Sequence, residues 1–378
     1  MSEDWERHAA RLAAEVTHPA SRWAAAVASV PRHTFVPRWW ARGQERWELR
    51  DGPADPAAWM EAAYSNRSLV TRVGPHHADK VANGDQADGF PTSSSTLPGL
   101  VVQMFRHGML TEGSQALCVT GSGYGTALLC RRLGEKSVTS VDLDRYLVES
   151  ARDRLEALGM RPSMGVHDIA GPLPGTYDRI VSTVSVPRIP TSWLTALRPG
   201  GRLVTTISHT GLIVTADKTE DGGAVGKVEW DRAGFMATRQ SDDYPPTLDD
   251  LFAAATDREG EEVTTGRYPV LDVQEAWDIW SMLALTCPGI EYRFRLGDED
   301  LRTLWMVHPD GSWARASAVW DDLPQVHQGG PRRLWNELES VRRRLNLEGG
   351  LPIYGAKVTV APDGRATFTR GRWSAVLE

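Results

Sequence analysis

The sequence predicts a doubly wound α/β domain, and three observations support this fold class. A short apolar run at 116–119 indicates a buried strand, which leads through a small-residue turn into a segment with helical spacing at 124–133. A second strand at 137–141 ends in Asp142. Strands and helices then continue to alternate as far as the strand that follows Pro199-Gly200-Gly201. This alternation is typical of a parallel sheet with helices on both of its faces.

The segments on either side of this domain have a different character. Residues 1–80 are predicted to form an N-terminal helical extension, in which 38–56 is irregular. Residues 81–215 hold the α/β domain, and the polar stretch at 75–95 is predicted to be a loop or hairpin that feeds a helix. Beyond this boundary, short strands separated by Asp/Gly turns predict that 216–378 is an α+β accessory region.

Composition and charge restrict the class of protein. The chain of 378 residues has a formal net charge of -7, which disfavours nonspecific binding to nucleic acid. Its apolar runs are too short to span a bilayer, and its acidic N-terminus lacks a signal-peptide core. The cysteines Cys118, Cys130 and Cys287 are scattered without the spacing of metal ligands. We therefore expect a reduced cytoplasmic protein with no metal site, no membrane association and no nucleic-acid partner.

The small-residue turn has the composition of a nucleotide-type ligand site. It runs Thr120-Gly121-Ser122-Gly123-Tyr124, in which the glycines let the backbone approach a ligand and the start of the helix offers free N–H groups. Asp142, followed by Leu143, ends the next strand about 20 residues later, where a carboxylate accepts hydrogen bonds from ribose hydroxyls. These features alone leave NAD and S-adenosylmethionine (SAM) open as the cofactor.

Residues after the third and fourth strands favour SAM. His167 and Asp168 follow the predicted third strand, where Asp168 can accept a hydrogen bond from the adenine amino group. Thr183 stands at the end of the fourth strand, and catalytic residues of open α/β sheets gather outside the carboxyl ends of strands. An acid after the second strand, an acid after the third and a later Pro-Gly-Gly turn form the order expected of a SAM site.

Over most of residues 30–207 the chain resembles the protein L-isoaspartate O-methyltransferases. The resemblance rests on five blocks in the same order: Val30 to Pro37, Ala63 to Leu69, Thr96-Leu97-Pro98 with Val101 and Met104, Thr120 to Tyr124 with Thr126 to Leu129, and Tyr177 to Val204. The serines before Thr96 and the long C-terminal part resemble a narrower branch, which accompanies ATP-grasp ligases or lanthipeptide synthetases. Members of that branch methylate an ordinary aspartate of a cyclised ribosomal peptide, and the ester closes to an aspartimide.

The resemblance implies a SAM-dependent O-methyltransferase that acts on a peptide carboxylate and releases S-adenosylhomocysteine (SAH). It implies a partner, a ribosomal precursor peptide of the graspetide kind after cyclisation by an ATP-grasp ligase. The accessory region 216–378 is then expected to recognise this peptide, and the extension 1–80 to lie on the substrate side.

The resemblance also implies roles for individual residues. Thr96, with Ser95 and Ser94 beside it, is expected to hold the substrate carboxylate. Other residues expected to contact the substrate are Tyr64, Arg67, His76, His77 and Val186. Residues expected to bind the cofactor are Thr120, Gly121, Ser122, Gly123, Tyr124, Asp142, Leu143, His167, Asp168 and Thr183.

Departures from the family pattern leave alternatives open. Leu117 stands where the family has an acid, and Val119 replaces the first glycine of the turn, so the cofactor ammonium loses one expected partner. Thr96 stands where the family has serine, and it keeps the hydroxyl. Two further hypotheses are repair of L-isoaspartate in damaged proteins and a catalytically weak SAM- or SAH-binding module that recognises a peptide.

Overall fold

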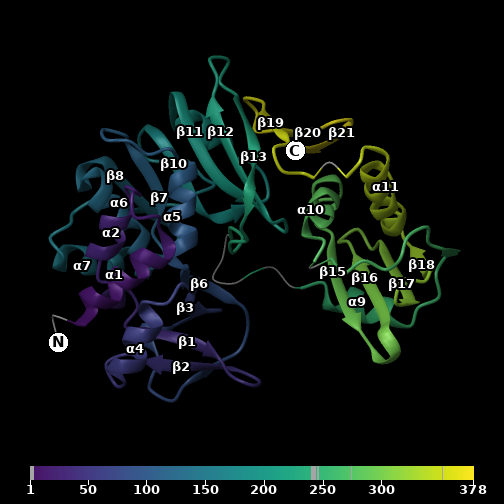
Figure 1. The fold of residues 1–378 in the computed structure, drawn as a ribbon, viewed down its shortest axis with the longest axis horizontal. Coiled ribbons are helices and arrows are strands. Elements are labelled where there is room, and N and C mark those ends of the chain that lie inside the picture. Colours follow the sequence, from purple (N-terminus) through teal and green to yellow (C-terminus); the bar gives the residue numbers. More distant parts are fainter. Residues whose placement is uncertain (1–3, 240–243, 245–246, 274, 351) are drawn as a thin grey trace.

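The computed structural model describes residues 4–239, 244, 247–273, 275–350 and 352–378. Two bodies lie side by side in Figure 1. The larger body contains the N-terminal half of the chain and the last strands, and the smaller one contains a separate sheet with its own helices. The chain leaves the larger body after β13 (Ala224–Arg232) and returns to it at β19 (Lys357–Val360), so the smaller body is an insertion.

The larger body is built on a mixed central sheet. Among the described residues, its strand order is β21-β20-β19-β13-β12-β11-β10-β7-β8-β9. The parallel strands are β7 (Ala116–Val119), β8 (Val138–Asp142), β9 (Ser163–Val166), β10 (Tyr177–Val186) and β11 (Leu197–Ile207). The antiparallel strands are β12 (Leu212–Lys218), β13, β19, β20 (Ala366–Arg370) and β21 (Trp373–Leu377).

The doubly wound α/β fold predicted from the sequence is confirmed. The parallel strands follow the apolar runs of the sequence, and helices alternate with them along the chain. The boundary proposed at 215 falls inside β12, which pairs with β11 in an unbroken ladder. The final hairpin of β19 and β20 also joins the central sheet, through β13. The sequence could not indicate this because it separates these strands by more than 120 residues.

Helices cover both faces of the central sheet. One apolar core forms between the sheet and α1 (Asp4–Val16), α2 (Ala24–Ser29), α5 (Pro98–His107), α6 (Tyr124–Leu133) and α7 (Arg145–Ala157). A second core lies on the opposite face, where α8 (Thr191–Ala196) supplies the buried Trp193. Gly123 precedes α6 with φ +92°, and a Cβ there would lie 2.8 Å from Cβ of Ala151. Glycine is therefore required for close packing of this turn.

A small antiparallel sheet lies at one end of the larger body. Its strands are β1 (Arg38–Arg42), β2 (Trp47–Asp51), β3 (Leu69–Val73), β4 (His76–His77), β5 (Gln86–Ala87) and β6 (Pro91–Ser95), and helices α3 (Arg32–Phe35) and α4 (Pro56–Ala63) pack nearby. The prediction that 38–56 is irregular was wrong, because β1 and β2 pair there over five registers. The serine run forms β6, which pairs with β3.

The smaller body is an antiparallel sheet between helices. Its described strands follow the order β14-β18-β17-β16-β15, and they are β14 (Glu262–Thr265), β15 (Glu291–Leu296), β16 (Leu301–Val307), β17 (Trp313–Val319) and β18 (Gln325–Gly329). Helix α9 (Asp249–Thr256) packs Phe252 on one face against Trp305 and Trp313. Helices α10 (Trp277–Thr286) and α11 (Leu334–Leu347) cover the other face.

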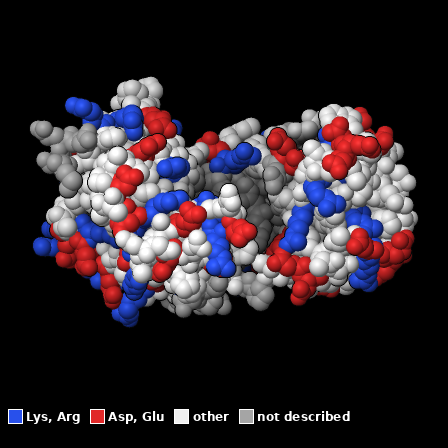
Figure 2. All heavy atoms as spheres, turned by 90° about the horizontal axis from the view of Figure 1, so that it is seen from below, with Lys and Arg blue, Asp and Glu red and all other residues white. Residues whose placement is uncertain are grey.

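Three single 3-10 turns complete the described elements, at η1 (Ala78–Lys80), η2 (Glu135–Ser137) and η3 (Asp298–Asp300). In the part of the chain that the structure describes, no helix combines the length and the apolar character needed to cross a membrane. Basic and acidic side chains are interspersed over both bodies on the face shown in Figure 2.

Candidate cofactor and substrate site

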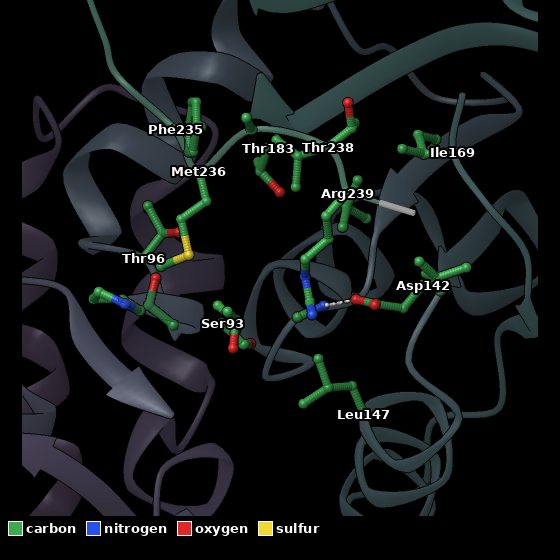
Figure 3. Close-up of a pocket in the computed structure, with 18 of the residues that line it drawn as sticks. Ser93, Thr96, Asp142, Leu147, Ile169, Thr183, Phe235, Met236, Thr238 and Arg239 are labelled. Atoms are coloured by element: carbon green, nitrogen blue, oxygen red, sulfur yellow. Dashed lines mark hydrogen bonds between the residues drawn. The ribbon is translucent and has the colours of Figure 1, made fainter. Parts of the chain in front are cut away.

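A cavity of about 260 Å³ opens at the carboxyl ends of the parallel strands, and we call it the larger cavity. Its walls come from three directions (Figure 3). The ends of β7, β8 and β10 form the floor, β6 and the start of α5 form one side, and residues 234–239 form another. Cofactor sites of open α/β sheets lie at this edge of the sheet.

Among the described residues, Asp142 is one of two acidic residues that line the larger cavity, with Asp168. One of its carboxylate oxygens accepts the Gly121 N–H at 2.9 Å, and the other accepts the Asp144 N–H at 3.1 Å. Burial raises the pKa of Asp142 to about 6, and the two backbone hydrogen bonds oppose that rise. The acid that ends β8 is therefore held rigidly at the glycine turn, as the sequence predicted for a ribose-binding position.

A smaller cavity of about 30 Å³ adjoins the larger one near Val119, which lines both. Its lining includes Ser95 and Tyr124. Both hydroxyls are buried, and neither has a hydrogen-bond partner among the described residues. An unsatisfied buried hydroxyl costs about 1–3 kcal/mol. This cavity is therefore suited to a small polar or charged group that would satisfy the two hydroxyls.

The hydroxyl-bearing strand β6 is held in place by the buried guanidinium of Arg32. This side chain donates to the carbonyls of Ser95 at 3.1 Å and Thr96 at 3.3 Å. It also donates to the carbonyls of Ala63, Ser65 and Arg67 at 2.8–2.9 Å. Burial lowers the pKa of Arg32 to about 10, which leaves it protonated at neutral pH. Arg32 thus joins the segment after α4 to the end of β6.

The side of the cavity opposite β6 is a short segment that follows β13, and we call residues 233–239 the strap. The Ser185 N–H donates to the Met236 carbonyl and the Thr238 N–H donates to the Ser185 carbonyl, both at 2.8 Å. Figure 3 shows Met236 and Arg239 pointing into the cavity from this segment. The strap therefore extends the edge of β10 and places its side chains over the floor.

A second acid lies behind the cavity and is paired internally. Asp144 Oδ2 lies 3.0 Å from His77 Nε2 and 3.3 Å from an Arg72 nitrogen. Its other oxygen accepts the Tyr146 N–H and so caps α7. Burial acts to raise the pKa of Asp144, but the hydrogen bond from His77 and the charges of His77 and Arg72 outweigh it and hold the pKa at about 2. His77 is therefore occupied in this pair.

The structure brings many of the predicted site residues together. The predicted residues that line the larger cavity are Ser94, Thr96, Gly121, Asp142, Leu143, Asp168 and Thr183. Those that line the smaller cavity include Ser95, Thr120, Ser122 and Tyr124. Thr120 is also bonded beneath the turn, with its Oγ1 2.7 Å from Ser140 Oγ.

Other predicted residues lie outside both cavities, as far as the described part of the chain extends: Tyr64, Arg67, His76, His77, Gly123, His167 and Val186. Tyr64 is buried, and its hydroxyl lies 2.7 Å from His33 Nδ1. Val186 is part of the apolar core, and the carbonyl of Arg67 accepts from Arg32. Burial therefore assigns Tyr64 and Val186 to structural support, and substrate contact by the exposed side chain of Arg67 stays a prediction.

Three functional positions were missed from the sequence. Met236 lies in a predicted short strand and Arg239 follows it, and nothing in the local pattern indicates that this strand folds back over the sheet. Arg32 lies within the matched block Val30 to Pro37, but no role was predicted for it. A buried arginine in a turn could not be foreseen, because its acceptors lie 31–64 positions away along the chain.

Together, the doubly wound sheet, the glycine turn and Asp142 define the SAM-dependent methyltransferase fold class. The family model described as Protein-L-isoaspartate(D-aspartate) O-methyltransferase matches residues 80–236. A curated relative, protein-L-isoaspartate O-methyltransferase 1 of Anaeromyxobacter sp. (strain Fw109-5), is 33% identical over 181 residues, which are 45% of this chain and 82% of the relative. The chain therefore belongs to the protein-L-isoaspartate O-methyltransferase family.

Other comparisons give partial matches. The chain spans 40% and 46% of the length of two further curated family members, so it covers less than half of each. A solved structure described as protein-L-isoaspartate O-methyltransferase is 17% identical, with a TM-score of 0.49 and 98% of both chains covered. A Plasmodium falciparum structure, described as a putative family member in complex with SAH, is 13% identical, with a TM-score of 0.44, 64% of this chain and 100% of that chain covered.

Proposed function

We propose that the chain is a SAM-dependent O-methyltransferase that methylates an aspartate carboxylate of a cyclised ribosomal peptide of the graspetide kind. The observation that carries the proposal is the shared lining of one cavity, in which Asp142 and the hydroxyl of Thr96 face a common space. Membership of the family supports methyl transfer to a peptide carboxylate.

The residues present fit the cofactor at both ends. At the nucleoside end, the carboxylate of Asp142 would accept from the ribose hydroxyls, and Asp168 lines the cavity where the adenine would lie. At the amino-acid end, this chain has Leu117 where the family has an acid. The unpartnered hydroxyls of Ser95 and Tyr124 would contact the cofactor ammonium in place of that acid. When bound, SAM supplies an electrophilic methyl group on a sulfonium centre.

The chain's own residues would then act mainly by positioning. A substrate aspartate is already ionised near pH 7, so no general base is required. The Thr96 hydroxyl would donate to the carboxylate oxygen that does not accept the methyl group, and Arg32 would fix Thr96 through its carbonyl. Apolar side chains from the strap and α5 would exclude water from the reacting oxygen.

The aspartimide would form from the methyl ester without a further cofactor. The backbone nitrogen of the residue after the aspartate attacks the ester carbonyl, loses its proton, and expels methanol. The peptide first gains one CH₂ and then loses one CH₃OH, so it ends one water lighter than the starting peptide. Both steps can be followed by mass spectrometry.

The smaller body is proposed to recognise the peptide. A cleft of about 570 Å³ lies between the 208–211 turn and the smaller body, and its lining includes Trp277, Trp280 and Tyr292. The carbonyl of Gly211 in that turn accepts the N–H of Ala233, the first residue of the strap, so the strap connects the cleft to the larger cavity. Aromatic side chains supply large apolar contact area for peptide side chains.

On β15, the strand that carries Tyr292, a basic row lies on the face that α9 covers, and it would complement acidic residues of such a peptide. In the described residues, β15 pairs only with β16, so it forms an edge of the sheet. Its Arg293 and Arg295 are exposed, and they lie over Phe252 at 4.2 Å and Trp305 at 5.2 Å. Arg293 is already paired with Asp249, so the ring of Trp305 would hold the charge of Arg295 toward an incoming peptide.

One experiment separates the proposal from its rivals. The purified chain is incubated with SAM and three synthetic peptides: an ester-crosslinked cyclic peptide with a free aspartate, its linear form and an isoaspartyl peptide. Methylation of aspartate in the cyclic peptide, followed by loss of methanol, is expected. Methylation of the isoaspartyl peptide alone would support repair. SAH binding without methylation of any peptide would support a binding module.

A further inference from the structure

The carboxylate that would hold the ribose already faces a cation from the strap. Figure 3 shows the Arg239 side chain extending from the strap across the larger cavity to Asp142. The two charges attract one another, since each shifts the ionisation of the other toward its charged form. The guanidinium of Arg239 therefore occupies the side of Asp142 to which the ribose hydroxyls of a nucleoside would bind.

The backbone that carries Arg239 has a fixed position. Ala237 forms a parallel bridge with Ser185, and the hydroxyl of Ser185 also donates to the Phe235 carbonyl at 2.9 Å. Arg239 lies two residues beyond this bridge, so its side chain reaches Asp142 from an anchored point. Residues 235–238 do not need to move for the guanidinium to turn away from the acid.

The remaining hydrogen-bonding capacity of Asp142 is small. A carboxylate has about four lone-pair sites on its two oxygens. The N–H groups of Gly121 and Asp144 each take one site, at 2.9 and 3.1 Å. Two ribose hydroxyls would use the rest, so a guanidinium beside the same oxygens competes with them.

We propose that Arg239 is an internal competitor for the nucleoside site, and that a bound ribose displaces it from Asp142 toward the substrate side of the cavity. The proposal rests on the function proposed above for the identity of the ligand. The displaced guanidinium, already within the cavity that Thr96 lines, then faces the incoming substrate carboxylate. Cofactor would therefore bind first and prepare an anion site for the peptide.

The test measures binding instead of turnover. SAH, adenosine and 2′,3′-dideoxyadenosine are titrated by calorimetry into the full chain, the Arg239→Met variant and the Arg239→Lys variant. Arg188→Met is the matched control, because Arg188 is exposed just beyond β10 and lines neither cavity in the described residues. Circular dichroism melts check that each variant is folded.

Arg239→Met is expected to bind SAH and adenosine about tenfold more tightly, because no guanidinium then has to be displaced from Asp142. The gain should be absent for dideoxyadenosine, which lacks the hydroxyls, and absent in Arg239→Lys and Arg188→Met. Unchanged or weaker SAH binding by folded Arg239→Met would overturn the competition while leaving the proposed function intact. Failure of every variant to bind SAH would overturn both.

Discussion

The guanidinium of Arg32 donates to the backbone carbonyl of Thr96 across 64 positions of sequence, at 3.3 Å. The same nitrogen donates to Ser95 and Arg67, so one buried cation fixes both the proposed carboxylate-holding residue and the segment beside it. All these acceptors are backbone carbonyl oxygens, so the side chains at the acceptor positions do not contribute to the contacts. The position of Thr96 depends instead on the planar, forked guanidinium of Arg32.

Replacement of Arg32 by methionine should lower the free energy of unfolding by roughly 3 kcal/mol or more, because several buried carbonyls lose their donor. Urea denaturation measures this change. Arg32→Lys should restore part of the stability but leave kcat low, since lysine lacks the planar fork. The exposed Arg67→Met variant is the control, because Arg67 contributes its backbone carbonyl to this network. Equal loss of stability in Arg67→Met would contradict the assignment.

Replacement of Thr96 by valine should reduce kcat about tenfold and leave SAH affinity unchanged, because the hydroxyl is proposed to orient the substrate alone. Valine keeps the volume of threonine, so packing around Leu97 and Leu100 is preserved. Thr96→Ser should retain most of the activity. Steady-state kinetics with the cyclic peptide, together with calorimetry for SAH, separates the two effects. Full turnover by Thr96→Val would remove this residue from the mechanism.

The parallel strands, the glycine turn and Asp142 could be predicted from the sequence, because apolar periodicity and small-residue turns are local signals. The strap could not be predicted. The strap is held on Ser185 by backbone hydrogen bonds to Met236 and Thr238, more than 50 positions away, and such bonds leave no trace in the side-chain pattern. The pairing of β13 with β19 was missed for the same reason.

The placement of site residues could be predicted where a local motif identified them, and could not be predicted where their role depends on distant contacts. Asp142 and Gly121 were identified by motif, and they lie together in the structure at 2.9 Å. Tyr64 was selected because it lies in a matched block, but that block serves the core, where burial raises the pKa of the Tyr64 phenol. A matched block shows that a position matters to the family, and only the tertiary contacts distinguish support from chemistry.

The affinity of the site for SAH should fall in acid, with a midpoint set by Asp142. Burial raises the pKa of this carboxyl from the model-peptide value of 3.8 to about 6, so it gains a proton as the pH falls through 6. Calorimetry should show SAH binding about tenfold weaker at pH 5 than at pH 7. In Arg239→Met the midpoint should move to higher pH, because the arginine charge favours the ionised acid.

The free energy of unfolding should increase as Asp142 gains a proton in acid, whereas the affinity for SAH decreases. Between pH 6 and 3.8 the folded chain holds a proton on Asp142 that the unfolded chain has lost, so the destabilising effect of the buried charge is removed as the pH falls. Asp142→Asn should therefore be relatively more stable than the unchanged chain at pH 7 and lose that advantage at pH 4. An advantage that grows toward low pH would contradict the buried, raised-pKa description.

Val119→Gly should strengthen SAH binding several-fold, because the isopropyl group stands at the junction of the two cavities. The added freedom of glycine at the end of a strand should lower the free energy of unfolding by about 0.5–1 kcal/mol. Calorimetry and urea denaturation measure the two quantities separately. Val119→Ala opens space but keeps the backbone restricted, so it distinguishes a steric effect from a conformational one. Weaker SAH binding by both variants would show that the valine side chain contacts the ligand.

Arg295→Met should weaken binding of an acidic cyclic peptide about threefold to tenfold without changing SAH affinity. Arg295 is exposed on the edge strand β15 and lies over Trp305, so its charge is available while its plane is held. Arg365→Met is the matched control, since Arg365 is an exposed arginine on the β19–β20 turn of the larger body. Fluorescence anisotropy of a labelled peptide reports the affinity, and raising the salt concentration should reduce the difference between the unchanged chain and Arg295→Met. Equal effects of the two substitutions would mean that the peptide responds to net charge alone, and the smaller body would then lose its proposed role in recognition.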